Sequence, residues 1–346
     1  MSKSRALSKA FLKDLKQGIL NPLLTRVKKD DTLMLAIRQG YINVYYRGGN
    51  LLKIVELPGG GYKAEFDAKY NRYGCQLPSF PCALKSVEAT TELVGTVPAI
   101  KEVMDYFFTE NPKLEREFQQ LVARENNYSS ISNETEYFIV DIEVADSELG
   151  ARFDMLAVRW LRTDRKREGV LLPVLIEMKY GGNALEGNAG IAEHLKDLEK
   201  LFSDDNPEYQ EKRRTDLLDS LEIQLEQLDE LGLLKFNRSE RVEKLLIDRS
   251  QPVEVVLLLA NVNPASTKLQ RVIREIPSTG LPFSLRFFAS SFAGYGMHRA
   301  NMLELGAMQA RVDNLLTSAS SRSLQHITAE ATGVRSVAVA DEQPIG

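Results

Sequence analysis

The chain of 346 residues has little of what builds disulfide-rich, zinc-binding or membrane-spanning proteins. Its two cysteines, Cys75 and Cys82, are too few for a disulfide framework, and its three histidines are too scattered for a zinc site. No apolar run is long enough to cross a bilayer. Near the N-terminus Phe11, Leu12 and Leu15 are interleaved with lysines, which is unlike a secretion signal. These absences predict a cytoplasmic protein that does not insert into a membrane.

The composition that is present is ordinary for a globular protein, with 43% hydrophobic and 27% charged residues. The length allows two domains, or one domain with a large insertion. We expect residues 1–95 to form a helix plus an antiparallel β-meander, and residues 96–315 to form an α/β domain with a mixed central sheet flanked by helices. Residues 204–250, approximately, read as a helical insertion in that domain, and residues 316–346 read as a mobile tail.

The first domain has clear local signals. Two short amphipathic segments predict helices, and four alternating segments separated by glycine turns predict the meander. Residues 67–95 read as an irregular linker, and Pro98 is the expected start of the next helix. Tyr41 and Tyr45 alternate with basic residues and could stack bases, but packing of these tyrosines in the sheet is the favoured interpretation. The predicted segments are 8–18 and 21–29 for the helices, and 32–38, 41–47, 51–57 and 62–66 for the strands.

Two strands of the second domain carry an unusual set of charges. Residues 151–158 and 172–180 are apolar, branched segments, yet the first contains Asp154 and the second contains Glu177 and Lys179. The two-residue period of a strand places Glu177 and Lys179 on one face. Charges on a buried strand are costly without partners, and a hairpin would add the Asp154 carboxylate to the same place. Two converging carboxylates predict a cation between them, and an all-oxygen site suits Mg²⁺ or Mn²⁺.

The pattern Asp154, then Glu177-Met178-Lys179 on the next strand, resembles the PD-(D/E)XK nuclease superfamily, the fold of many restriction endonucleases and repair nucleases. The resemblance covers roughly residues 100–300, with helix, three strands, helix and strand in the family's order. It implies a restriction-endonuclease-like core and a metal-dependent nuclease with DNA as the favoured substrate, acting in restriction, anti-phage defence or repair. It also implies that Asp154, Glu177 and Lys179 are catalytic, and that Asp154, Glu177 and the Met178 carbonyl hold the metal.

Some members of this family bind the metal through another acid, so the resemblance implies a possible further ligand in this chain. Glu117 and Glu125 on the helix predicted over residues 113–124, and Glu143 on the first core strand, are the candidates. On the helix after the site, His194 and Lys196 are candidates for contacting the substrate phosphate. In the first core strand, period two predicts one face of Phe138, Val140, Ile142 and Val144, and an opposite face of Tyr137, Ile139, Asp141 and Glu143.

The net charge of −4 argues against a protein that coats nucleic acid nonspecifically. Contact with a nucleic acid therefore depends on where positive residues cluster. The turn between the two site strands carries one such cluster, and Arg159, Arg162, Lys166 and Arg167 are the predicted nucleic-acid contacts. A solvated face is the more common role of a charge run.

Two alternatives stay open at the level of sequence. The chain could be a nucleic-acid-binding or regulatory module of this fold that does not cut. The stripe of Leu217, Leu221, Leu225, Leu228 and Leu231 predicts a helix that packs on its own chain, with a dimer contact as the alternative. A homodimer, or a partner protein bound through the N-terminal domain or the insertion, is compatible with either function.

Overall fold

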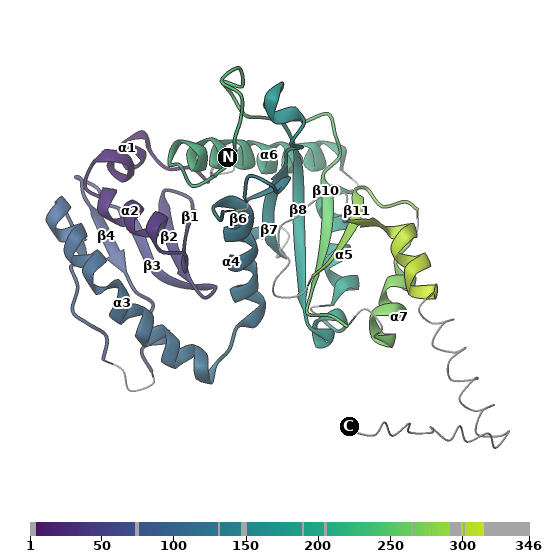
Figure 1. Ribbon diagram of the computed structural model, residues 1–346, viewed down its shortest axis with the longest axis horizontal. Coiled ribbons are helices and arrows are strands. Elements are labelled where there is room, and N and C mark those ends of the chain that lie inside the picture. The colour runs from purple at the N-terminus through teal and green to yellow at the C-terminus, as the bar shows by residue number, and fades with distance from the viewer. Residues whose placement is uncertain are drawn as a thin grey trace, which may run out of the picture.

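The computed structural model describes residues 5–72, 76–130, 132–146, 151–188, 190–203, 206–263, 266–277, 279–290, 299 and 302–314. Within these residues the protein is α/β, with an antiparallel sheet near the N-terminus and a mixed sheet flanked by helices (Figure 1). This confirms the predicted fold class. The predicted mobile tail lies outside the described residues. Across the described part of the chain, no helix has both the length and the apolarity to cross a membrane.

The N-terminal unit, residues 5–86, contains a helical pair and a five-stranded antiparallel sheet whose strands follow chain order. Ser8 caps the first helix by accepting a hydrogen bond from the Phe11 N–H, and Pro22 lies in the first turn of the second helix. The predicted helices and meander are confirmed, and a two-residue strand completes the sheet. The elements are α1 (Lys9–Gln17), α2 (Asn21–Lys29), β1 (Leu33–Ile37), β2 (Tyr41–Tyr46), β3 (Gly49–Glu56), β4 (Tyr62–Glu65), the 3₁₀ turn η1 (Ala68–Tyr70) and β5 (Ala83–Leu84).

The next helix, α3 (Val87–Glu110), starts well before the predicted position at Pro98. Ser86 caps it, and Pro98 lies inside the helix, where it removes one backbone hydrogen bond. Burial of apolar neighbours such as Leu93 and Val97 offsets that loss. The expectation of an irregular segment through residue 95 was therefore wrong, and the predicted boundary between residues 95 and 96 falls inside α3.

The rest of the described chain builds a mixed sheet and the helices around it. The elements are α4 (Leu114–Asn127), β6 (Tyr137–Asp146), β7 (Ala151–Arg159), η2 (Asp164–Lys166), β8 (Val170–Tyr180), η3 (Gly182–Leu185), α5 (Ile191–Phe202), α6 (Pro207–Glu230), β9 (Leu246–Ile247), β10 (Glu254–Ala260), α7 (Thr267–Glu275), β11 (Ser284–Ser290) and β12 (Leu303–Glu304). The strand order is β12-β11-β10-β8-β7-β6, with β9 paired to β8 beside this path. Strands β6, β7 and β8 are antiparallel neighbours, whereas β10 and β11 run parallel to β8. Helices α5 and α6 cross over between β8 and β10, as a parallel pair requires.

Helices cover both faces of this sheet. On one face α4 packs through Phe118 and Val122 against Ile139 and Met155. On the other face α5, α6 and α7 contribute to a larger apolar cluster that includes Leu156. Strand β10 is consequently buried along its whole length.

An irregularity in β6 changes which side chains face which helices. The pairing with β7 skips Val140, and Asp141 pairs with Leu156 of the larger cluster. Because one extra residue reverses the alternation, Ile142 lies with Ile139 in the cluster on the α4 side. The prediction that Ile142 shares a face with Val140 and that Asp141 shares a face with Ile139 was therefore wrong.

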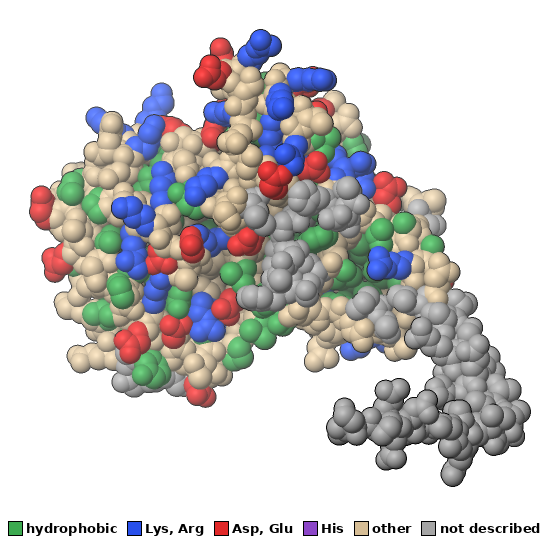
Figure 2. Space-filling model, in the orientation of Figure 1, with side chains coloured by type: hydrophobic (Ala, Val, Ile, Leu, Met, Phe, Trp, Pro, Cys, Tyr) green, Lys and Arg blue, Asp and Glu red, His purple; other side chains and the backbone are tan. Residues whose placement is uncertain are grey.

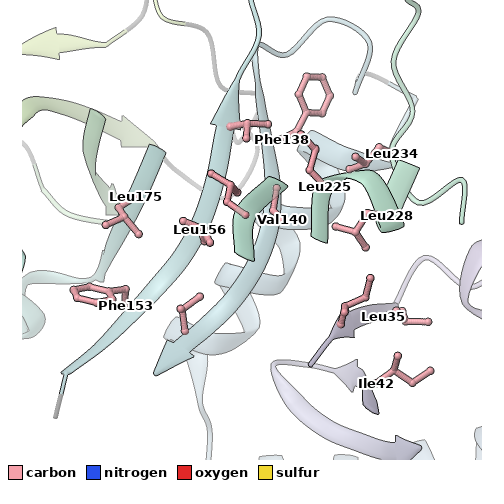
Figure 3. Packing of buried hydrophobic residues seen from close by; sticks show 14 of the residues in the cluster. Leu35, Ile42, Phe138, Val140, Phe153, Leu156, Leu175, Leu225, Leu228 and Leu234 are labelled. Atoms are coloured by element: carbon pink, nitrogen blue, oxygen red, sulfur yellow. The ribbon is translucent and has the colours of Figure 1, made fainter. Parts of the chain in front are cut away.

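Helix α6 joins the two sheets. Figure 1 shows it crossing above both, and Figure 3 shows Leu225 and Leu228 of α6 beside Val140 of β6 and Leu35 of β1. All four side chains belong to one continuous buried cluster. The predicted packing of the leucine stripe on its own chain is confirmed for these residues. The N-terminal unit and the second sheet consequently share a core.

The chain start is tied to the same helix by hydrogen bonds. The Gln227 side-chain amide accepts from the Leu7 N–H at 3.0 Å and donates to the Leu7 carbonyl at 3.1 Å. Lys16 of α1 pairs with Glu230 at 3.0 Å. Since the Gln227 contacts are buried, they fix the backbone that leads into α1.

A buried carboxylate forms the polar part of the junction. Asp141 is fully buried and accepts hydrogen bonds from Arg5 at 2.6 Å and from Arg38. Arg38 also donates to the Ile142 carbonyl at 2.8 Å and to the Tyr45 hydroxyl at 3.0 Å. Because Arg38 directly follows β1 and Asp141 lies on β6, this ion pair connects the two sheets. The buried position of Tyr45 confirms the packing interpretation for that residue.

Replacing Asp141 with alanine should destabilise the protein by about 3–5 kcal/mol, because Arg38 would remain buried without its counter-charge. Equilibrium urea unfolding at neutral pH measures this cost. Glu65→Ala, which removes an exposed partner of Lys53 and Lys63, is the control and should change stability by less than about 1 kcal/mol. Equal costs for the two substitutions would contradict the importance of the junction.

Candidate functional site

The three predicted catalytic side chains lie together at the end of the β7–β8 pairing. The last paired residues are Met155 and Ile176, and the strands separate beyond them, at Asp154 and Glu177. Asp154 accepts a hydrogen bond from the Met178 N–H at 2.7 Å, which bridges the gap. Lys179 contacts Glu177 at 3.0 Å, as their shared strand face predicts. Asp154, Glu177 and Lys179 are 7%, 2% and 2% exposed, so these charges interact inside the protein rather than in water.

Helix α4 supplies two side chains that the sequence interpretation missed. Gln119 donates from Nε2 to Asp154 Oδ1 at 2.7 Å, and the Tyr180 N–H points to Glu115 Oε2 at 3.4 Å. An apolar stripe that started at Leu114 would set the buried face of α4, but Leu114 is exposed. The buried face is rotated by one residue, and the i, i+4 spacing of Glu115 and Gln119 next to Phe118 was the available signal.

The three acids proposed earlier as additional ligands pair with arginines or lie further along α4. Glu117 pairs with Arg47 of the N-terminal unit at 3.0 Å. Glu143 pairs with two arginines. Glu125 is ten residues beyond Glu115 on α4, which is about 15 Å along a helix axis. Glu115 is the glutamate of α4 that lies beside the site, 3.4 Å from the Tyr180 N–H.

Helix α5 supplies one more group. His194 contacts Glu177 Oε1 through Nδ1, on the oxygen that Lys179 also contacts. The glycine-rich segment before the helix reverses the chain, and Gly181 has a φ of 72°, which favours glycine. Lys196, the other candidate on this helix, is exposed and pairs with Glu193 at 2.7 Å, so it is not part of the site.

The surroundings shift the pKa values of Asp154 and Glu177 in opposite directions. Burial, followed by the charges of Glu177 and Glu115, raises the pKa of Asp154 well above its usual value. Burial opposes ionisation of Glu177 as well, but the contacts from His194 and Lys179 outweigh it and lower the pKa of Glu177. Burial also raises the pKa of Glu115. The site thus holds three carboxyl groups beside one lysine and one histidine.

The donor atoms fit a hard cation. Among the described residues no group of three or more His, Cys, Asp and Glu side chains is arranged as a ready metal cage. Asp154, Glu177 and Glu115 nevertheless offer carboxylate oxygens, and the buried Gln119 Oε1 has no hydrogen-bond partner. Mg²⁺ commonly takes one or two carboxylates and keeps several waters, so it suits this incomplete oxygen set.

The predicted nucleic-acid contacts in the β7–β8 turn lie away from the site. Arg159 is five residues beyond Asp154, about 16 Å along a strand, and its side chain, 11% exposed, lies 3.7 Å from Glu254. It therefore offers little surface to a nucleic acid. Arg162 is exposed but pairs with Glu134, and Lys166 and Arg167 are exposed. Figure 2 shows Lys and Arg side chains at the top of the view, where Figure 1 places η2.

Comparisons of the chain with family models, curated proteins and solved structures found no match. The functional assignment therefore rests on the chemistry of this site.

Asparagine at position 154 should stabilise the protein in EDTA at pH 8. An acid whose folded pKa is raised loses stability as the pH rises from its unfolded pKa through the folded one, and asparagine removes that loss. The gain should disappear below about pH 3, where the carboxyl is protonated in both states. Melting temperatures across this pH range, with Asp197→Asn of α5 as the exposed control, measure the effect. A variant less stable than wild type at pH 8 would contradict the raised pKa.

Proposed function

We propose that the protein is a metal-dependent nuclease that hydrolyses nucleic-acid phosphodiester bonds, with DNA as the favoured substrate. The observation that carries the proposal is the meeting of Asp154, Glu177 and Lys179 where β7 and β8 separate. The order α4, β6, β7, β8, α5, β10 supports it, because the resemblance to the PD-(D/E)XK superfamily implies helix, three strands, helix and strand.

The carboxylates of Asp154 and Glu177, with the Met178 carbonyl, would hold Mg²⁺ or Mn²⁺, and Glu115 is the additional acid. When bound, the metal supplies a polarised phosphate and a water of lowered pKa. Gln119 and the Met178 N–H fix the orientation of Asp154 through two hydrogen bonds of 2.7 Å. A fixed carboxylate loses no conformational entropy at the moment of reaction.

Lys179 orients the attacking water and stabilises negative charge on the phosphoryl oxygens. Its ammonium group is held 3.0 Å from Glu177 in a buried setting, where a single charge acts more strongly than in water. His194 holds the same Glu177 oxygen from α5 and so fixes the carboxylate from the opposite side.

The biological setting follows from the resemblance. A nuclease of this kind acts in the cytoplasm, in restriction, anti-phage defence or repair. The N-terminal unit or the region around α6 is the proposed surface for a second copy or a partner protein.

A second candidate is a nucleic-acid-binding module that does not cut. The observation in its favour is that Lys179 and His194 both contact Glu177, within described residues that contain no ready metal cage. Such a protein would bind nucleic acid equally well in EDTA and would leave it intact.

Cleavage of plasmid, linear duplex, single-stranded DNA and RNA, each with Mg²⁺ or EDTA, tests the proposal. We expect cleavage only with the metal, and a rate at least about 100-fold lower for Lys179→Ala, because the buried charge that stabilises the phosphoryl oxygens is lost. Lys196→Ala, an exposed lysine on the neighbouring helix, is the control and should cut normally. Full activity in EDTA or in Lys179→Ala would contradict the proposed chemistry.

Metal binding should be visible as a stability change without any substrate. At a concentration 100 times its dissociation constant, Mg²⁺ or Mn²⁺ should stabilise the wild-type protein by about 2.7 kcal/mol. Asp154→Asn and Glu177→Gln should abolish the shift in melting temperature, and Glu193→Gln should keep it. An unchanged shift in Asp154→Asn would place the metal elsewhere.

A further inference from the structure

We propose that Arg116 and Arg152 form the phosphate-binding subsite that holds the nucleic-acid backbone beside the cleavage site. This inference rests on the proposed function. It moves the substrate contact from the β7–β8 turn to the other end of β7, where α4 and the β6–β7 pair meet.

The two arginines share one acid. Arg116 Nη2 and Arg152 Nη1 both lie 3.0 Å from the same oxygen, Glu143 Oε2. Their side chains are 42% and 56% exposed, whereas that of Glu143 is only 15% exposed. Two guanidinium groups and one carboxylate leave a net charge of about +1 at the surface, with donors to spare, since a guanidinium has five N–H groups.

The backbone at Glu143 is shaped for this contact. Glu143 has a φ of 52°, in the left-handed region that a residue with a side chain seldom adopts. The register between β6 and β7 gives Ile142 and Val144 partners on β7, whereas none is recorded for Glu143. Such local strain is unfavourable and persists where the surrounding contacts hold the conformation. Here it turns the carboxylate toward an arginine from each neighbouring element.

The pair is next to the reacting groups. Arg152 precedes Asp154 by two residues on β7, and Arg116 directly follows Glu115 on α4. Arg116 is also three residues before Gln119, which holds Asp154, so the two lie on adjoining turns of the same helix face. The subsite therefore flanks the carboxylates from two elements at once.

The other basic groups offer less. Arg159 is only 11% exposed and lies against Glu254, and Lys166 and Arg167 lie at the far end of the hairpin. Arg213 is buried against Tyr209, and Arg214 donates to backbone carbonyls. A phosphodiester backbone is the occupant that fits the pair beside the site, because exposed guanidinium groups bind phosphate oxygens through paired N–H donors.

Binding of fluorescein-labelled single-stranded and duplex DNA to the full-length protein in EDTA tests the subsite. For Arg116→Gln/Arg152→Gln we expect about tenfold weaker binding, and a salt dependence of log K that is shallower by about 1.8 for duplex, since each arginine neutralises one phosphate. Lys166→Gln/Arg167→Gln removes the same charge from the turn and should bind like wild type. Glu143→Gln should bind a few-fold more tightly, because the carboxylate no longer competes for the arginines.

Arg116→Lys/Arg152→Lys controls for folding, because it keeps the charges that Glu143 requires and should retain most of the affinity. Equal binding by wild type and the folded double glutamine variant would overturn the subsite and leave the nuclease proposal standing. A larger loss in Lys166→Gln/Arg167→Gln would return the contact to the turn. If the wild-type protein bound no DNA and cut none with Mg²⁺, the proposed function would fail together with this inference.

Discussion

Two carboxyl groups buried on adjacent strands are the constraint on which this structure depends. Asp154 and Glu177 lie where β7 and β8 separate, and neither side chain has more than slight contact with solvent. Two such groups cannot both ionise in a low-dielectric interior unless positive charge is brought to them. Lys179 and His194 contact Glu177 rather than Asp154, and burial raises the pKa of Asp154. An arrangement so costly without a cation is unusual as a purely structural element, and it is what a metal-dependent hydrolase requires.

The N-terminal unit contributes to this site indirectly, by fixing α4. Gln120 accepts a hydrogen bond from the Gly48 N–H at 2.7 Å and donates to the Thr32 carbonyl at 2.8 Å. Arg124, further along the helix, pairs with Asp31 at 2.7 Å. Figure 1 shows α4 standing between the two sheets, with one side toward each. The small sheet thus fixes the rotation and position of the helix.

Sequence predicted those parts of the site that depend on local periodicity. Glu177 and Lys179 share a face because the strand period is two, and a hairpin brings Asp154 to them. The choice among glutamates on α4 was not local, because the N-terminal unit sets which side of the helix faces the sheet. One skipped residue in β6 likewise reversed Asp141 and Ile142, and no composition rule reveals a bulge. The sequence likewise did not show which distant acids pair with the arginines.

The acids that pair with arginines determine where a polyanion can bind. The chain has a net charge of −4, and much of its positive charge is matched by nearby acids. Arg159 and Arg286, for example, both lie against the buried Glu254 and are lost to the surface. Arg116 and Arg152 also share one carboxylate, but they differ in being 42% and 56% exposed. The exposure of the guanidinium groups, together with the local balance of charge, therefore controls the field that a phosphate meets more than the total charge does, and at Glu143 both favour the cations.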